Sequence, residues 1–355
     1  MSDVLSLIDR LSRDRSLTEE EYEVLVSGYT PEAASFAASL ASSVRREYYG
    51  DEVFMRGLME ISNYCRNDCF YCGIRRSNRS CSRYRLTPSE IISCASKGYG
   101  LGFRTFVLQG GEDPYYTDDV LCSIVSSIKS MHPDCAVTLS MGERSYESYA
   151  ALFSAGADRY LLRHETASAP HYAKLHPSSM SFENRMRCLK DLRSIGYQVG
   201  CGFMVGSPYQ TPSDLASDLK FIETFRPDMC GIGPFIPHKD TPFGSESRGS
   251  AEMTCYLLSL IRLIFPPVLL PATTALGTID PLGREKGLKA GANVVMPNLS
   301  PVEVREKYTL YDNKICTGEE ASECVSCLSS RIKNAGYRLV TDRGDIRKEK
   351  INGKV

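Results

Sequence analysis

Short apolar runs alternate with longer amphipathic segments along most of this 355-residue chain. The apolar runs have the length of buried strands, and they lie at residues 53–62, 105–108, 136–139, 159–162, 198–205, 229–235, 269–274 and 293–296. The segments between them have helical periodicity, and they lie at residues 87–99, 119–131, 145–155, 181–195, 212–225, 252–264 and 281–290. This alternation predicts an α/β fold, namely a closed (β/α)8 barrel of the TIM type with parallel strands. An open doubly wound sheet is less consistent with the chain, because no Gly-x-Gly-x-x-Gly follows the first strand.

Other patterns flank this predicted barrel on both sides. Two N-terminal helices are expected, because Thr18 and Glu21 form a capping box and Thr30-Pro31 supplies an N-cap followed by proline. At the other end, a short helix precedes a charged tail at residues 342–354, which we expect to be solvated or docked by local ion pairs. We therefore divide the chain into a helical layer, the barrel and a C-terminal extension, at residues 1–50, 51–300 and 301–355.

Charge and composition exclude several classes of partner. The chain has 42 Lys and Arg against 43 Asp and Glu, so nothing predicts a nucleic acid or an anionic membrane as a partner. No apolar run approaches the roughly 20 residues that span a bilayer, and the first residues lack the pattern of a secretion signal. We expect a cytoplasmic protein whose 14 cysteines are reduced thiols and metal ligands, because disulfides are rare in that compartment.

Three cysteines lie close together directly after the first predicted strand. Cys65, Cys69 and Cys72 have the spacing Cys-x3-Cys-x2-Cys, and Tyr71 precedes the third. Structural zinc sites close with four protein ligands, and ferredoxin clusters use four cysteines. Three thiolates can instead hold three irons of a [4Fe–4S] cubane and leave one iron open. The alternatives are an incidental group of cysteines and an incomplete zinc site.

The cysteine spacing and the aromatic residue resemble the signature of the radical S-adenosylmethionine (AdoMet) enzymes. In that family the open iron binds the amino and carboxylate groups of AdoMet. One electron then cleaves AdoMet to a 5′-deoxyadenosyl radical. The resemblance therefore implies a [4Fe–4S] cluster and AdoMet as cofactors, and it requires a reducing electron donor.

Polar or glycine-rich residues gather where each predicted strand ends. They lie at Asn63 and at residues 109–112, 140–143, 163–165, 202–206, 233–235, 273–274 and 297–298. In a parallel barrel all of these ends lie on one face, where the active sites of such barrels are found. Buried polar groups without partners cost several kcal/mol, so a polar ligand in the barrel mouth is expected.

A second cysteine triplet follows the last predicted strand. Cys316, Cys324 and Cys327 have the spacing Cys-x7-Cys-x2-Cys, without a flanking aromatic residue or a preceding strand. Either these cysteines hold a second iron–sulfur cluster or they are scattered structural thiols. Because the triplet lies after the barrel, any cluster there is expected to be peripheral.

Several longer runs extend the resemblance from residue 50 to residue 335. These runs lie at residues 65–75, 83–88, 109–116, 156–166, 181–185, 231–238, 271–275 and 293–298. In these runs the chain resembles the HydE family of FeFe-hydrogenase maturases, which belongs to the biotin synthase-like group of radical AdoMet enzymes. The spacing of Cys316, Cys324 and Cys327 is similar to that of HydE proteins that retain a second cluster.

This resemblance implies roles for individual residues. The cluster would be held by Cys65, Cys69 and Cys72. The AdoMet site would be formed by Tyr71 along the adenine, Gly110 and Gly111 where the backbone comes close, Glu112 at the amino group, Ser140, Glu165, Arg185 at the methionine carboxylate, and Tyr308. The amino-acid part of the substrate would be bound by Arg163, Thr273, Thr274 and Tyr311.

The function implied by the resemblance is assembly of the binuclear iron subcluster of FeFe hydrogenase. The expected substrate is a small cysteine-bound iron carbonyl cyanide complex, whose sulfur the adenosyl radical would attack. Other hydrogenase maturases are the expected partners. The alternatives are a methylornithine synthase-like or biotin synthase-like radical AdoMet enzyme acting on a small amino-acid substrate, and a non-enzymatic iron–sulfur carrier or scaffold. Biotin synthase is disfavoured, because it keeps its auxiliary cluster inside the barrel.

Overall fold

A closed ring of parallel strands forms the centre of the protein, whose computed structural model describes residues 3–318 and 321–348. Six strands pair in chain order, namely β2 (Gly57–Ser62), β3 (Thr105–Gly110), β4 (Ala136–Ser140), β5 (Arg159–Leu161), β6 (Gln198–Cys201) and β8 (Met229–Cys230). Bridges from Met229 to Leu269 and from Pro271 to β10 (Val294–Val295) continue the ring. Pairing of β10 with β1 (Glu52–Met55) closes it. The predicted (β/α)8 barrel is confirmed.

Three of the predicted strands are interrupted. The first breaks at Arg56 into β1 and β2, and the fifth and sixth continue as the short strands β7 (Met204–Val205) and β9 (Gly233–Pro234). Gly202 has φ +154°, and a Cβ there would lie 2.0 Å from the carbonyl oxygen of Gly231. The backbone segments around Gly202 and Gly231 therefore approach each other too closely for a side chain at residue 202. The strand pairing is interrupted at this point, where the barrel mouth begins.

The strand predicted at residues 269–274 is wrong in its second half. Only Leu269 and Pro271 form isolated bridges, and helix α11 (Thr274–Ile279) begins directly afterwards. Pro271 has no N–H to donate to a ladder. Thr273 caps α11, because its Oγ1 accepts a hydrogen bond from the N–H of Leu276 at 3.3 Å. This early turn into a helix carries both threonines to the barrel mouth.

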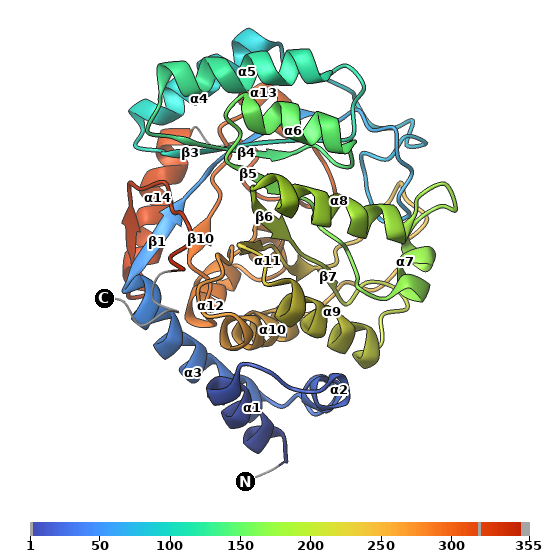
Figure 1. Ribbon diagram of the computed structural model, residues 1–355, viewed down its shortest axis with the longest axis vertical. Helices are drawn as coiled ribbons and strands as arrows, with labels where there is room; N and C mark the ends of the chain where they lie inside the picture. Colours follow the sequence, from blue (N-terminus) through green and yellow to red (C-terminus); the bar gives the residue numbers. More distant parts are fainter. Residues whose placement is uncertain (1–2, 319–320, 349–355) are drawn as a thin grey trace.

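Helices cover the outer face of the strand ring (Figure 1). They are α4 (Pro88–Gly100), α5 (Asp118–Met131), α6 (Tyr146–Ser154), α8 (Phe182–Ile195), α9 (Pro212–Phe225), α10 (Ala251–Ile264) and α12 (Gly283–Lys289). Helix α4 begins with a capping box, in which the Thr87 side chain accepts from the N–H of Glu90 and the Glu90 carboxylate accepts from the N–H of Thr87. A short helix between β5 and α8, α7 (Ala169–Leu175), was not predicted.

Three N-terminal helices lie against this helical ring, one more than predicted. They are α1 (Asp3–Asp14), α2 (Glu19–Ser27) and α3 (Pro31–Tyr49), and the caps expected at Thr18 and Thr30 are present. Helix α3 packs on α10, which is buried along most of its length. An all-round apolar helix needs such a covering layer. None of the helices among the described residues is long and apolar enough to cross a membrane.

The C-terminal extension returns to the barrel. After α13 (Val302–Arg305) and α14 (Ala321–Asn334), strand β11 (Arg338–Val340) pairs with β1 in parallel. In the tail, Asp345 lies 2.5 Å from Nη2 of the buried Arg159 and accepts a hydrogen bond from Gln198. The described part of the tail is thus docked by ion pairs at the beginnings of β5 and β6.

Candidate active site

A cavity of about 370 Å³ lies at the carboxyl ends of the strands. It is lined by all of the residues to which the sequence assigned the first cluster, AdoMet or the substrate, namely Cys65, Cys69, Tyr71, Cys72, Gly110, Gly111, Glu112, Ser140, Arg163, Glu165, Arg185, Thr273, Thr274, Tyr308 and Tyr311. These residues come from the loops and strand ends around the ring and are spread over nearly 250 positions of the chain. The fold therefore brings the whole predicted set to one place.

The cysteine loop is held in shape by Arg83, a residue to which the sequence assigned no role. Its guanidinium donates to four backbone carbonyls of the loop, those of Asn63, Ile74, Arg75 and Asn78. The distances to Ile74 and Arg75 are 2.8 and 2.6 Å. Only an arginine has enough donors in a planar fork to join so many carbonyls.

We predict that Arg83→Met lowers the iron content of the reconstituted protein and weakens AdoMet cleavage at least tenfold. The reason is that four carbonyls lose a charged donor, and each such bond contributes about 1.5–3 kcal/mol. Iron analysis and a 5′-deoxyadenosine assay measure the effect. Arg79→Met is the matched control, because this side chain of the same loop is exposed and donates to none of the four carbonyls. Full iron content in Arg83→Met would contradict the proposal that Arg83 holds the cysteine loop in shape.

The three thiols of this loop are partly buried in the cavity wall. Burial raises the pKa of all three, for Cys72 to about 12, and for Cys69 and Cys72 the other thiols of the loop raise it further. Iron binds the thiolate form, so the positive charge of a bound cluster would offset this penalty. Sδ of Met180 lies 3.7 Å from Sγ of Cys69 and gives this thiol an apolar, polarisable neighbour.

No three His, Cys, Asp or Glu side chains in the described residues are arranged as ligands of a single metal ion. A cubane has a different requirement, because each cysteine binds its own iron and the thiolates stay apart. Three thiols around one enclosed space, with no fourth protein ligand among them, fit a [4Fe–4S] cluster with one open iron.

Tyr71 is fixed by a histidine from the segment after α7. Its hydroxyl lies 3.2 Å from Nε2 of His176, and Nδ1 of His176 lies 3.0 Å from the carbonyl oxygen of Tyr172. Since a carbonyl can only accept, Nδ1 carries the proton and Nε2 accepts from Tyr71. Burial lowers the pKa of His176 to about 3, so the ring is neutral. This chain of contacts holds the tyrosine ring at the cavity wall.

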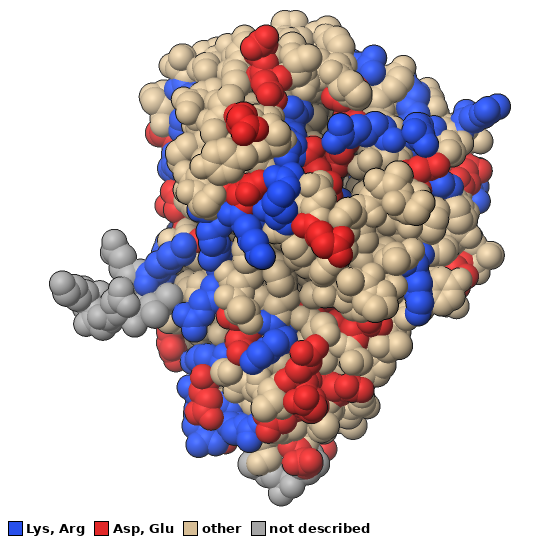
Figure 2. Space-filling model, turned by 45° about the vertical axis from the view of Figure 1, so that its right-hand side comes forward, with Lys and Arg blue, Asp and Glu red and all other residues tan. Residues whose placement is uncertain are grey.

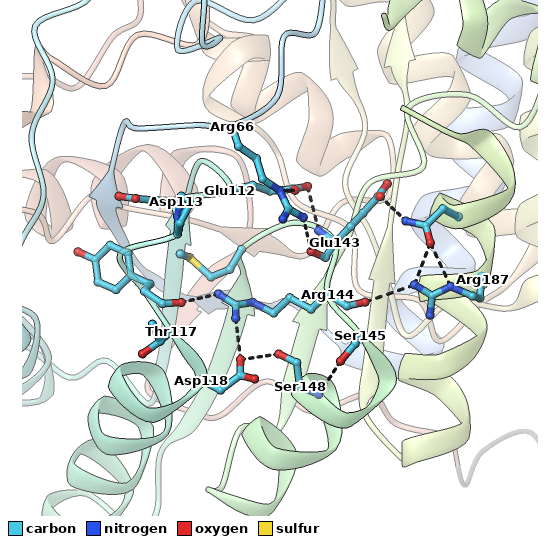
Figure 3. Close-up of a pocket in the computed structure, with 14 residues that line it drawn as sticks. Arg66, Glu112, Asp113, Thr117, Asp118, Glu143, Arg144, Ser145, Ser148 and Arg187 are labelled. Atoms are coloured by element: carbon cyan, nitrogen blue, oxygen red, sulfur yellow. Dashed lines mark hydrogen bonds and ion pairs between the residues drawn. The ribbon is translucent and has the colours of Figure 1, made fainter. Parts of the chain in front are cut away.

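An ion-pair wall closes one side of the cavity. Glu112 accepts from Nε of Arg66 at 2.9 Å and from the N–H of Glu143 at 2.9 Å, and Glu143 pairs with Arg185 at 2.5 Å. On the far side of Glu112 lies an open pocket of about 560 Å³ (Figure 3). Glu112 lines both spaces. The larger pocket contains none of the three cysteines, so the chemistry belongs to the smaller cavity.

Gly111 is required by the packing of the cysteine loop, in addition to the close approach of AdoMet that the sequence predicts. A Cβ at this position would lie 2.2 Å from the carbonyl oxygen of Tyr64 and 2.7 Å from Cβ of Cys65. The backbone of the cysteine loop therefore rests directly on Gly111. Any larger residue would displace the first cysteine.

Arg163 and Glu165 face each other across the cavity wall. Nη2 of Arg163 lies 3.2 Å from Oε2 of Glu165, in a geometry that makes an ion pair without a hydrogen bond. Within the described part of the chain, Nε and Nη2 of Arg163 and Oε2 of Glu165 are buried and have no hydrogen-bond partner. Buried donors and acceptors of this kind are normally satisfied. The site thus offers unused polar groups to a ligand, as AdoMet and a carboxylate require.

Glu165 is also held in an unusual backbone conformation. Its φ is +66°, its N–H donates to the carbonyl oxygen of Gly202, and its carbonyl accepts from Met204. The adjacent His164 is fully buried and pairs with Asp218 at 3.1 Å. A left-handed conformation in a residue other than glycine costs about 1 kcal/mol or more, so these contacts fix Glu165 against strain.

A buried ion pair at the floor of the cavity was not predicted. Nζ of Lys314 donates to Oε1 of Glu60 at 2.5 Å and to the carbonyl oxygen of Tyr308 at 2.9 Å. Asn298 donates to the other carboxylate oxygen at 2.8 Å. In the sequence, Glu60 is a lone acidic residue within an apolar strand, which is a signal for a buried partner. Nothing in the sequence near Lys314 indicates that this residue of the C-terminal extension contacts the barrel.

Cys316, the first cysteine of the second triplet, lies next to the floor of the cavity. Cys316 lines a small space of about 20 Å³ together with Thr274 and Lys314, which also line the main cavity. Its Sγ accepts from Nη2 of Arg284 at 3.4 Å, and its φ is +64°. Cys327 is exposed on α14, and the side chain of Cys324 lies outside the described residues. Whether these cysteines bind a second cluster stays a prediction.

Comparison with known proteins identifies the family. Residues 59–222, which run from β2 into α9, match the model of the Radical SAM superfamily. Over 342 residues the chain is 46% identical to the [FeFe] hydrogenase maturase subunit HydE of Thermotoga maritima, and the match covers 96% of each protein. The chain belongs to the HydE family of radical SAM enzymes. Membership implies a [4Fe–4S] cluster and AdoMet, and the prediction of a radical AdoMet enzyme is confirmed.

Methylornithine synthases share the same fold. The chain is 30% identical to 3-methylornithine synthase of Methanosarcina barkeri over 335 residues, which are 94% of this chain and 93% of that protein. The crystal structure of methylornithine synthase (PylB) superposes with a TM-score of 0.83 at 27% identity, covering 98% of this chain and 99% of that one. The barrel is thus similar along its whole length to that of methylornithine synthase.

Proposed function

We propose that this protein is a maturase that helps to build the binuclear iron subcluster of FeFe hydrogenase, acting on a cysteine-bound iron carbonyl cyanide complex. The observation that carries the proposal is the cavity that contains the three thiols together with buried groups of Arg163 and Glu165 that have no hydrogen-bond partner among the described residues. The 46% identity to a HydE subunit along nearly the whole chain supports the hydrogenase context.

Each part of the cavity has a separate task. Cys65, Cys69 and Cys72 hold the cluster, which with AdoMet supplies a 5′-deoxyadenosyl radical. Tyr71 and Arg185 position AdoMet beside it. The barrel walls exclude water and hold the substrate sulfur near the ribose, and such positioning contributes much of the rate in reactions of this kind.

The substrate end of the cavity is suited to an amino acid. Arg163 supplies two buried donors that have no hydrogen-bond partner among the described residues, and Thr273 and Thr274 line the same space. A guanidinium fork binds a carboxylate with two parallel hydrogen bonds. A cysteine that carries iron through its sulfur would leave its carboxylate free for this contact. We expect other hydrogenase maturases to supply the complex and to receive the product.

A methylornithine synthase-like activity is the second candidate, because the carboxylate contact suits any small amino acid and the barrel matches PylB. The test uses reconstituted protein, dithionite and AdoMet, with either the synthetic iron–cysteine complex or a mixture of free amino acids as substrate. We expect 5′-deoxyadenosine to form faster with the iron complex, and the product mixture to activate a hydrogenase apoprotein. Formation of methylornithine from the amino acids would favour the second candidate, and no AdoMet cleavage would refute both.

The second triplet gives a further prediction. We expect the triple change of Cys316, Cys324 and Cys327 to alanine to lower the iron content but to leave 5′-deoxyadenosine formation and hydrogenase maturation largely intact. Neither Cys316 nor Cys327 lines the main cavity. Circular dichroism controls for folding. Loss of both activities in a folded variant would show that a cluster at this position takes part in the reaction.

A further inference from the structure

Helix α9 contributes a fully buried acidic side chain, that of Asp218. Acidic side chains are normally solvated, and Figure 2 shows Asp and Glu beside Lys and Arg across one face of the protein. Among the described residues, only His164 lies within ion-pair distance of Asp218, and burial lowers the pKa of His164 to about 3, so this ring is neutral. A buried carboxylate without a cation is costly. The contacts of Asp218 therefore need an explanation other than charge pairing.

One oxygen of Asp218 contacts the chain on both sides of Glu165. Oδ1 lies 3.1 Å from Nε2 of His164 and accepts from the N–H of Ala167 at 2.6 Å. His164 directly precedes Glu165, and Ala167 follows it by two positions. The other oxygen, Oδ2, is buried and has no hydrogen-bond partner within the described part of the chain. A single acceptor atom thus fixes the backbone before and after a residue that lines the cavity.

His164 connects this carboxylate to the end of the neighbouring strand. Its Nδ1 accepts from the N–H of Gly202 at 3.3 Å, so the ring proton lies on Nε2 and is donated to Asp218. The carbonyl oxygen of Gly202 accepts from the N–H of Glu165 at 3.0 Å. Both polar groups of Gly202 are therefore bound by two consecutive residues, His164 and Glu165.

The backbone of Glu165 requires such supports. Its φ of +66° lies in the left-handed region, which is unfavourable for a residue with a side chain. Strained conformations of this kind persist only when the surrounding structure holds them. Without the contacts of Asp218 and His164, we expect the backbone to relax and the carboxylate of Glu165 to leave its place in the cavity.

We propose that Asp218 and His164 are positioning residues that hold the carboxylate of Glu165 in place for AdoMet. This inference rests on the proposed function, in which Glu165 belongs to the AdoMet site. Neither Asp218 nor His164 lines the cavity, so both act through Glu165 and not by contact with a ligand. The competing explanation is a purely structural one, in which the pair only fastens α9 to the strand ring.

The first test compares two changes of Asp218. We expect the dissociation constant of AdoMet to rise about tenfold or more in reconstituted Asp218→Ala, because two buried donors lose their acceptor. Asp218→Asn should restore most of the affinity, because asparagine keeps one oxygen as an acceptor. Iron content should stay at the wild-type level in both variants, since the cysteine loop is untouched. Wild-type AdoMet affinity in a folded Asp218→Ala protein would overturn the proposal.

The matched control is Asp228→Ala. Asp228 is also a buried aspartate that accepts from a backbone N–H, that of Val199 at 2.8 Å. It directly precedes β8, at the end of the barrel opposite the cavity. We expect this variant to lose stability but to bind AdoMet as the wild type does. A loss of AdoMet affinity as large as that in Asp218→Ala would assign both effects to general destabilisation and overturn the proposal.

His164→Phe is a second variant that keeps the packing of the ring. The ring of His164 lies near those of Phe203 and Phe221, with centroids 5.8 and 4.7 Å away, so a phenylalanine has apolar neighbours there. The change removes both ring nitrogens, and we expect a loss of AdoMet affinity similar to that of Asp218→Ala. Circular dichroism verifies the fold. Unchanged AdoMet affinity in the folded variant would refute the role of the histidine.

A double-mutant cycle with Glu165→Ala separates positioning from a purely structural role. If Asp218 acts through Glu165, adding Asp218→Ala should cost almost no further AdoMet affinity once the carboxylate has been removed. Additive losses in the double variant would overturn the proposal, because the two residues would then act independently. Wild-type AdoMet affinity in Glu165→Ala alone would instead refute the place of Glu165 in the proposed function.

Discussion

Replacing Cys69 with alanine is expected to abolish AdoMet cleavage. Two thiols would remain for three irons, and the substitution would leave a second unligated iron beside the open one. Because ligand loss lowers affinity for the whole cluster and metal binding couples to local folding, we expect most of the charge-transfer absorbance to disappear. The 5′-deoxyadenosine yield should fall to less than about 1% of the wild-type yield, a difference of roughly 3 kcal/mol or more in the barrier.

The control for this change is Cys255→Ala. Cys255 lies on α10, packed against the hydrophobic core and outside the cavity, so its loss removes a thiol without touching the cluster loop. This variant should keep its absorbance and its AdoMet turnover. Unchanged turnover in Cys69→Ala would contradict the assignment of the first triplet, whatever the control shows.

The barrel could be predicted because its strands are buried on both faces and its helices on one. Those two environments produce different patterns of hydrophobic residues along the sequence. The beginnings of helices, such as Thr87-Pro88 and Thr211-Pro212, are also marked by residues that cap a helix locally. The failures are places where tertiary contact overrides the local pattern. Residues 269–274 are apolar enough for a strand, but Pro271 and the cap at Thr273 end it early.

The residues of the site could be proposed because a parallel barrel gathers its strand ends on one face. That rule places Arg163, Glu165 and Thr273 together without knowledge of their contacts. It does not identify supports that come from distant segments. Arg83 and Lys314 act through backbone carbonyls or a buried carboxylate, and only the folded chain brings these partners together.

Replacing Arg163 with methionine is expected to stop maturation while AdoMet still binds. Two buried donors of the guanidinium, Nε and Nη2, have no hydrogen-bond partner within the described residues, and they line the cavity. A ligand carboxylate would satisfy both. Loss of a charge-assisted pair of this kind costs a few kcal/mol, or on the order of a hundredfold in affinity. Arg163→Lys should bind the substrate with an affinity between those of the wild type and of Arg163→Met, because lysine keeps the positive charge but lacks the planar guanidinium.

The ion pair with Glu165 provides the competing explanation, and it makes a different prediction. If Arg163 mainly holds Glu165 in place, Arg163→Met should weaken AdoMet as much as it weakens the substrate. The strained backbone of Glu165 is already fixed by Gly202 and Met204, and the carbonyl of Arg163 that accepts from Arg185 survives the substitution. The AdoMet site should therefore keep its shape. Dissociation constants for AdoMet and for the iron–cysteine complex, measured on the same preparation, decide between the two. Equal losses would assign Arg163 to the support of Glu165, and a loss confined to the iron complex would assign it to the substrate carboxylate.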